Sequence, residues 1–217
     1  MNVLWAPLLL LGVVLLPLIP VLVLFQARKY GPLRFLFAVA AGVFSVLTAG
    51  LAQFFFPLHL PDQGQMGELL FSIFIRISLV EELSRVLTLS LLFHFIPYIG
   101  IRDRPALGAP LGLAAGLGFA AGESIFYGLS DPGIALLRVF TAALHGACGA
   151  RIGSALAQLK TQPFNALSLF VSAVCIHGMY NFCILNPGVP WFFSAFIALS
   201  ALSSSLINIY FSDAAKK

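Results

Sequence analysis

Two adjacent glutamates and an arginine stand in an otherwise apolar run at residues 69–96. On a helix, Glu81, Glu82 and Arg85 share one face with Ser78 and Thr88, because the five recur at i, i+3, i+4, i+7 and i+10. A charge at the centre of a bilayer costs about 3 kcal/mol on insertion scales. These side chains should therefore be buried against polar partners from other segments.

Candidate partners stand within three other apolar runs. They are Glu123 in 108–129, His145 in 134–157 and His177 in 164–184. Counted at 1.5 Å per residue from the ends expected to be external, Glu81 and these three residues lie about 10–20 Å deep. Each alone has a structural explanation, a hydrogen bond between helices or, for Glu81 and Arg85, an ion pair. Their concentration at one level on four segments favours a functional site.

Such a set is suited to two kinds of hydrolysis. Two histidines and a carboxylate are the usual protein ligands of a catalytic zinc ion, and a second carboxylate then serves as general base on a water molecule. A glutamate and a histidine that activate water together need no metal, and spacing alone does not choose between the two. Asn181, on the same helix face as His177, is placed to donate to a developing oxyanion or to orient a ligand.

The composition is that of a membrane protein. Of 217 residues, 60% are hydrophobic and 9% are charged, and the mean hydropathy is +0.99, whereas soluble domains carry roughly 25% charged residues. The net charge of +4 calls for no nucleic-acid partner, because the basic residues lie mostly in short connections between apolar runs. Cys148, Cys175 and Cys183 lie in apolar runs without a C-x-x-C spacing, so we expect them to pack rather than to form disulfides.

Seven apolar runs come close to the ~20 residues that a helix needs to cross a bilayer. They cover residues 3–25, 35–56, 69–96, 108–129, 134–157, 164–184 and 190–211. The first is too long for a signal peptide and lacks its basic start, so we expect it to be retained. No linker is long enough to separate two domains. The expected fold is a single all-α bundle of about seven transmembrane helices over residues 1–217.

The basic residues predict the orientation of this bundle. Lysine or arginine follows the first, third, fifth and seventh runs, whereas the alternate connections carry Asp62, Glu68 and Asp131 and no basic residue. We therefore expect the N-terminus outside and the C-terminus in the cytoplasm. Three arginines near the ends of runs are expected to extend to the lipid headgroups; they are Arg76, Arg138 and Arg151.

Small residues spaced by four mark the fourth and fifth runs. The series are Gly108, Gly112 and Gly116; Gly118 and Gly122; Ala142, Gly146, Ala150 and Ser154; and Gly149 and Gly153. Such series allow helix backbones to approach closely in lipid. We expect them to hold the helices of Glu123 and His145 rigidly together.

The order of these polar motifs resembles that of the PrsW family of intramembrane proteases, which is grouped with the CAAX prenyl endopeptidases and the bacteriocin-immunity proteins. The matching motifs are Glu81-Glu82-Leu-Ser-Arg85, Gly118-Phe119-x-x-x-Glu123 with Tyr127 nearby, His145-x-x-x-Gly149 and His177-x-x-x-Asn181. They follow the family's order on four consecutive runs that cover roughly half of the chain. Two positions depart from the family's usual pattern, which more often has lysine at Arg85 and asparagine at Ser124.

The resemblance implies a multi-pass protease of the cell membrane, in bacteria the plasma membrane. Its substrate would be a single-pass membrane protein, such as an anti-sigma factor, cut on the extracytoplasmic side. The residues that carry over as the catalytic set are Glu81, Glu82, Glu123, His145 and His177. Within that set we assign Glu81 as general base and Glu82 as the partner of Arg85. Glu123, His145 and His177 are assigned as metal ligands or direct catalytic partners, with Asn181 assisting the oxyanion; the expected metal is Zn²⁺, and a metal-independent glutamic mechanism stays open.

Two other classes of function also use buried glutamate and histidine. The Aph subunit of gamma-secretase, a scaffold, is distantly similar in its topology and its pair of intramembrane histidines, so a non-catalytic scaffold or an immunity-type binding protein is one alternative. A scaffold has no need of the paired glutamates and Glu123. A proton-coupled transporter would need a polar path to both surfaces, whereas the faces beyond Arg85 and Thr88 are largely apolar. The sequence therefore favours an intramembrane protease.

Overall fold

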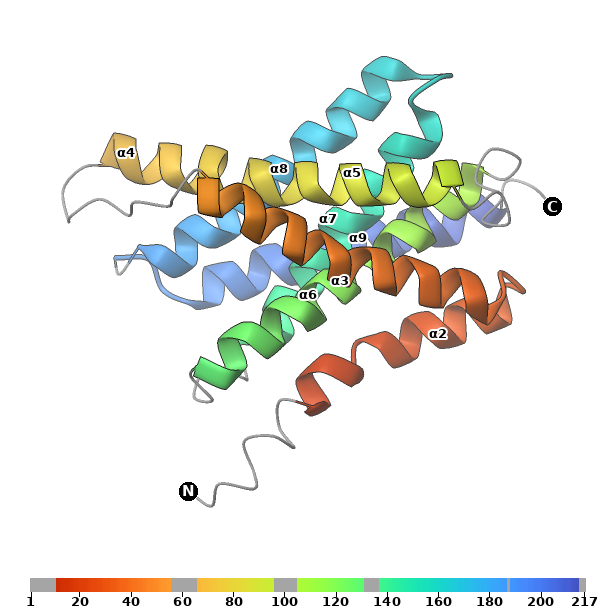
Figure 1. Cartoon of the computed structure of the whole chain (residues 1–217), viewed down its shortest axis with the longest axis horizontal. Helices are drawn as coiled ribbons and strands as arrows, with labels where there is room; N and C mark the ends of the chain where they lie inside the picture. The colour runs from red at the N-terminus through yellow and green to blue at the C-terminus, as the bar shows by residue number, and fades with distance from the viewer. Residues whose placement is uncertain (1–10, 56–65, 96–104, 131–136, 187, 215–217) are drawn as a thin grey trace.

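The computed structural model describes residues 11–55, 66–95, 105–130, 137–186 and 188–214, and these ranges contain helices and short turns without a strand. The helices are α2 (Leu18–Ala27), α3 (Pro32–Phe55), α4 (Met66–Phe71), a π-helical segment (Ser72–Leu79), α5 (Val80–Phe95), a 3-10 turn (Pro105–Leu107), α6 (Gly108–Ser130), α7 (Arg138–Gln158), α8 (Pro163–Leu185) and α9 (Phe192–Ala214) (Figure 1). The prediction of an all-α membrane protein is confirmed.

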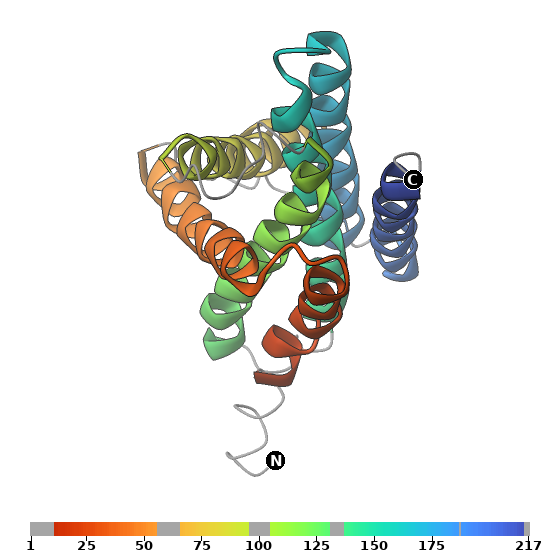
Figure 2. The same cartoon turned by 90° about the vertical axis from the view of Figure 1, so that its right-hand side faces the viewer.

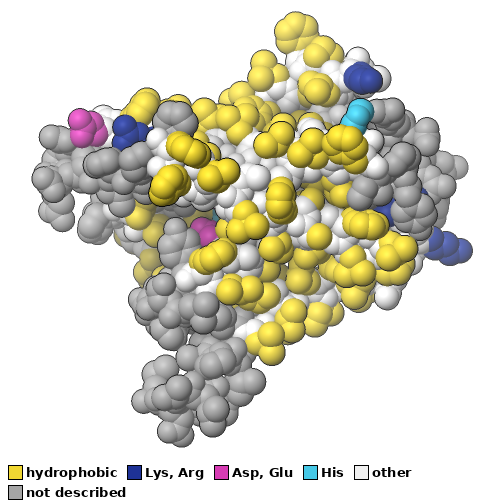
Figure 3. All heavy atoms as spheres, viewed as in Figure 1, with side chains coloured by type: hydrophobic (Ala, Val, Ile, Leu, Met, Phe, Trp, Pro, Cys, Tyr) yellow, Lys and Arg dark blue, Asp and Glu magenta, His cyan; other side chains and the backbone are white. Residues whose placement is uncertain are grey.

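The described helices overlap the apolar runs of the sequence. Four are long and apolar enough to cross a bilayer, namely Pro32–Phe55, Gly108–Phe126, Pro163–Leu185 and Phe192–Phe211, and Leu11–Ala27 is a shorter apolar helix. The expected first span begins at residue 3, outside the described ranges. Hydrophobic side chains are spread over the described surface seen in Figure 3, where charged side chains are few.

Helix α7 lies at the centre of the bundle. It packs against α6, α8 and α9, while α3 packs against α5 and α6. Figure 2 shows α9 on one side of the molecule and α3 and α5 on the other. Most side chains of α7 are buried, so this helix can present polar groups to several neighbours at once.

Glycines bring the backbones of α6 and α7 into direct contact. A Cβ atom at Gly112 would collide with the carbonyl oxygen of Gly149, and one at Gly149 would collide with that of Gly112. Gly108 and Gly153 face each other in the same way. The close approach predicted from the small-residue series is confirmed, and it fixes the distance between the helices that carry Glu123 and His145.

The paired glutamates follow directly on the π-helical segment. Segments of this kind are rare and occur frequently at functional sites. This one packs against α8, where the ring of Phe74 lies so close to Gly178 that a Cβ there would collide with it. The glycine next to His177 therefore allows the chain that leads into Glu81 to lie against α8.

Two of the three arginines expected at the headgroups point into the bundle instead. Arg138 is 9% exposed and lies against Glu123. Arg151 donates to the hydroxyl of Ser205 at 2.7 Å and to the carbonyl oxygen of Ala201 at 3.3 Å, so it connects α7 to α9. Lipid-embedded guanidinium groups with protein acceptors in reach have no need to extend to water. Arg76 lies with its guanidinium 5.5 Å from the ring centre of Phe71.

Candidate active site

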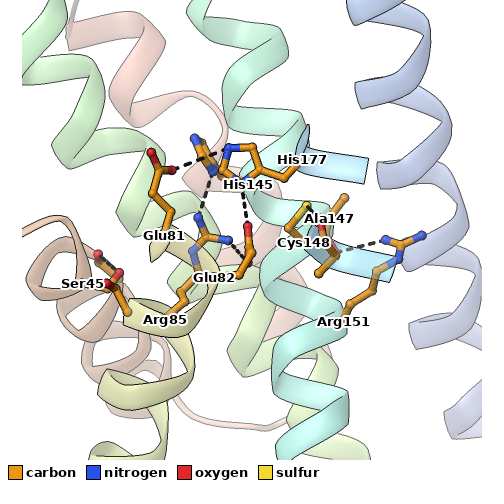
Figure 4. Close-up of polar contacts among 12 residues, drawn as sticks. Ser45, Glu81, Glu82, Arg85, His145, Ala147, Cys148, Arg151 and His177 are labelled. Carbon is orange, nitrogen blue, oxygen red and sulfur yellow. Dashed lines mark hydrogen bonds and ion pairs between the residues drawn. The ribbon is translucent and has the colours of Figure 1, made fainter. Parts of the chain in front are cut away.

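The polar face predicted for the third span is buried as a whole. Ser78, Glu82 and Arg85 have no exposed surface, and Glu81 and Thr88 retain 7% and 4%. The other half of the site comes from α6, α7 and α8, which supply one residue each, Glu123, His145 and His177. Figure 4 shows the residues of α5, α7 and α8 pointing toward one another, and Glu123 of α6 contacts His145.

His177 lies between the two adjacent glutamates. Its Nδ1 is 2.8 Å from Oε1 of Glu82, and its Nε2 is 3.6 Å from Oε2 of Glu81. Oε2 of Glu81 is buried and has no hydrogen-bond partner among the described residues. A buried carboxylate oxygen without a partner is costly, so this atom marks a place where a further polar group belongs.

Arg85 connects the glutamate pair to the second histidine. Its Nη1 donates to Oε2 of Glu82 at 2.5 Å, and its Nη2 is 3.0 Å from Nδ1 of His145. The guanidinium carbon lies 4.4 Å from the ring centre of Phe119, a cation–π distance. The predicted pairing of Glu82 with Arg85 is present in the structure, and it compensates two charges that have no access to water.

His145 and Glu123 form the far end of the network. Nε2 of His145 is 2.9 Å from Oε2 of Glu123, and the same oxygen is 2.8 Å from Nη2 of Arg138. Nε of Arg138 also donates to the hydroxyl of Ser124 at 3.3 Å. Arg138 was not predicted as a site residue. An arginine at the start of one helix and a glutamate in the middle of another carry no signal in the sequence that they pair.

Asn181 is on α8 one turn after His177 and is half-buried. Its side chain forms no hydrogen bond with the residues that the structure describes. Nearby, the hydroxyls of Thr141 and Tyr180 lie 2.8 Å apart and connect α7 to α8. The structure therefore brings five of the six predicted site residues into one network and leaves Asn181 beside it.

The donor set fits a divalent metal ion. Ligand atoms of Glu81, His145 and His177 all lie within 4.8 Å of one another, and all three residues are buried. Two imidazoles and a carboxylate are the usual protein ligands of catalytic zinc, and Glu81 is also the residue whose buried Oε2 has no hydrogen-bond partner among the described residues. This group differs in one residue from the metal ligands assigned from the sequence. It contains Glu81 in place of Glu123, because Glu123 Oε2 already faces both His145 and Arg138.

Comparison with known proteins identifies the family to which the chain is similar. The model of the PrsW family of intramembrane metalloproteases matches residues 31–204, which include the whole network described above. No curated protein and no solved structure matches the chain.

Proposed function

Because the chain belongs to the PrsW family of intramembrane metalloproteases, we propose that it hydrolyses a peptide bond of a single-pass membrane protein close to the outer surface of the bilayer. The observation that carries the proposal is the group of Glu81, His145 and His177, buried in the bundle with their ligand atoms within 4.8 Å of one another. The expected depth of these residues supports a cut in the outer half of the membrane. An anti-sigma factor, the kind of substrate that the resemblance implies, is our candidate for the protein that is cut.

The ligands of a metal in this site would be drawn from Glu81, His145 and His177. When bound, the metal would polarise the scissile carbonyl group and lower the pKa of water, as catalytic zinc does. Proton transfer from the attacking water is left to a side chain of the protein. Glu81 carries the buried carboxylate oxygen without a hydrogen-bond partner, and this oxygen is free to take a proton from water.

The other charged residues hold this machinery in place. Glu82 is fixed between Arg85 and His177, so its two oxygens orient both of them. Arg138 balances the charge of Glu123. A preorganised arrangement of this kind costs no reorganisation at the moment of reaction.

The proposal is tested by cleavage of tagged single-span reporter proteins in proteoliposomes that contain the purified protein. Glu81→Gln keeps the shape of the side chain but removes the carboxylate, which is the proposed base and a candidate metal ligand, so we expect the cleavage rate to fall by at least roughly 10²–10⁴-fold. Glu68→Gln is the matched control, because Glu68 is exposed on α4, apart from the network, and its loss should leave the rate unchanged.

Mass spectrometry of the fragments locates the cut, which we expect towards the side that carries the acidic connections. Full activity of Glu81→Gln would show that Glu81 is not the base. Absence of cleavage by the wild-type protein across the reporters, which should include an anti-sigma factor, would count against the proposed function as a whole.

A further inference from the structure

In the two histidines of the site, Nδ1 faces partners of opposite charge. Nδ1 of His177 faces a carboxylate oxygen, Oε1 of Glu82, at 2.8 Å. Nδ1 of His145 faces a guanidinium nitrogen, Nη2 of Arg85, at 3.0 Å. Because a carboxylate only accepts and a guanidinium only donates, the two contacts require different protonation of the two rings.

The partners of His145 assign its proton to Nε2. Arg85 has hydrogen-bond donors alone, so Nδ1 of His145 must accept and carries no proton. Nε2 then carries the single proton of the neutral ring, and it lies 2.9 Å from the acceptor Oε2 of Glu123. The contacts at both nitrogens, from two different helices, lead to the same tautomer.

His177 is in the complementary state. Its Nδ1 donates to Glu82, and its Nε2 is directed at the carboxylate of Glu81, 3.6 Å away. A histidine that binds a metal through one nitrogen usually donates its other N–H to a carboxylate or a carbonyl oxygen. His177 and Glu82 have this arrangement.

His145 cannot bind a metal through Nε2 in the same way. The metal would replace the only proton of the ring, and Arg85 prevents Nδ1 from taking up another, so the ring would have to become an anion. Arg85 has little freedom to withdraw, since it is fully buried, paired with Glu82 and packed on Phe119. The imidazole is equally confined, with ring centres 4.8 Å from Phe119 and 5.0 Å from His177.

We infer that His145 serves as a hydrogen-bond donor and not as a metal ligand, and that Arg85 is the positioning residue that fixes it in this role. The inference rests on the proposed function and refines it. A metal in the site would be held through Nε2 of His177, and the Nε2–H of His145 donates to the carbonyl oxygen of the substrate as negative charge develops there. Glu123 holds this N–H in position before substrate enters.

A first experiment measures zinc bound by the purified, detergent-solubilised protein after equilibration with zinc and removal of the excess. We expect His177→Ala to lose at least tenfold in zinc affinity and His145→Ala to stay within about threefold of the wild type. An equal loss of zinc affinity in both variants would overturn the inference, and the proposed protease function would still stand. A wild-type protein that binds no zinc would also overturn it, and persisting cleavage would show that the protease function stands.

A second experiment reads the tautomers directly, without metal and without activity. In protein labelled with ¹⁵N-histidine and freed of metal, NMR should show the proton of His145 on Nε2 and that of His177 on Nδ1; single replacement of each of the four histidines assigns the signals. Arg85→Lys keeps a cationic donor and should preserve the tautomer of His145. Arg85→Met removes this donor, so the proton of His145 should then be found on either ring nitrogen. A wild-type His145 protonated on Nδ1 would refute the inference even if Arg85→Met failed to fold.

Discussion

At the scale of single residues, the site is an alternating chain of charges inside a membrane protein. Arg85 and Arg138 each face a glutamate, and His145 lies between the two pairs. A charged group in the membrane interior is tolerated when it has a partner. Glu81 differs from the other two glutamates of the site, because one of its oxygens is fully buried without a hydrogen-bond partner in the described part of the chain. The least compensated group is the one that we assign to chemistry.

Removal of Glu82 should destabilise the protein strongly. Glu82→Ala leaves Arg85 buried without its carboxylate, and the loss of one member of a buried ion pair typically costs about 3–5 kcal/mol. Thermal unfolding in detergent should therefore show a clearly lowered Tm. Glu68→Ala, at an exposed position of α4, should change the stability by less than about 0.5 kcal/mol. Equal Tm values for the two variants would contradict the structural role of the Glu82–Arg85 pair.

At the scale of helices, the glycines of α6 and α7 set the geometry of the site. Glu123 on α6 reaches His145 on α7 because the two backbones touch at Gly112 and Gly149. Gly116 also faces the carbonyl group of His145 itself, where a Cβ would collide with the oxygen. A change in helix separation therefore acts directly on His145.

Gly112→Leu should separate α6 from α7. The added side chain collides with the backbone of Gly149, and overpacking of this kind typically costs about 1–3 kcal/mol. We expect both a lowered Tm and a loss of reporter cleavage, since the contact of Glu123 with His145 is stretched. The matched control is Gly50→Ala on α3, where a Cβ meets no atom within 4 Å. This variant should be active and stabilised by about 0.5–1 kcal/mol; wild-type activity of Gly112→Leu would refute the packing argument.

At the scale of the whole molecule, the orientation in the membrane decides on which side a substrate is cut. The basic connections predict a cytoplasmic C-terminus. A green fluorescent protein fused after Lys217 should therefore be fluorescent, and an alkaline phosphatase fused there should be inactive, because the latter requires export to fold. The opposite pattern would move the proposed cut to the cytoplasmic side of the membrane.

Much of the fold could be predicted from the sequence, for a physical reason. Lipid demands about 20 apolar residues per span and close packing at small residues, and both requirements leave local patterns that can be read directly. The same reasoning identified Glu81, Glu82, Glu123, His145 and His177, because an ionisable residue in an apolar run is conspicuous. It did not reveal the π-helical segment, whose hydrogen bonding depends on how this part of the chain packs against α8.

The sequence by itself singled out five of the residues that the structure brings together, because the cost of burying a charge in lipid is a property of each residue and its neighbours along the chain. Only the tertiary structure decided how these residues pair. Arg138 reaches Glu123 from another helix, and Arg85 and Glu82 cover Nδ1 of different histidines. Pairings of this kind depend on distances of about 3 Å between helices, which are set by packing across the bundle and leave no trace in the order of the residues.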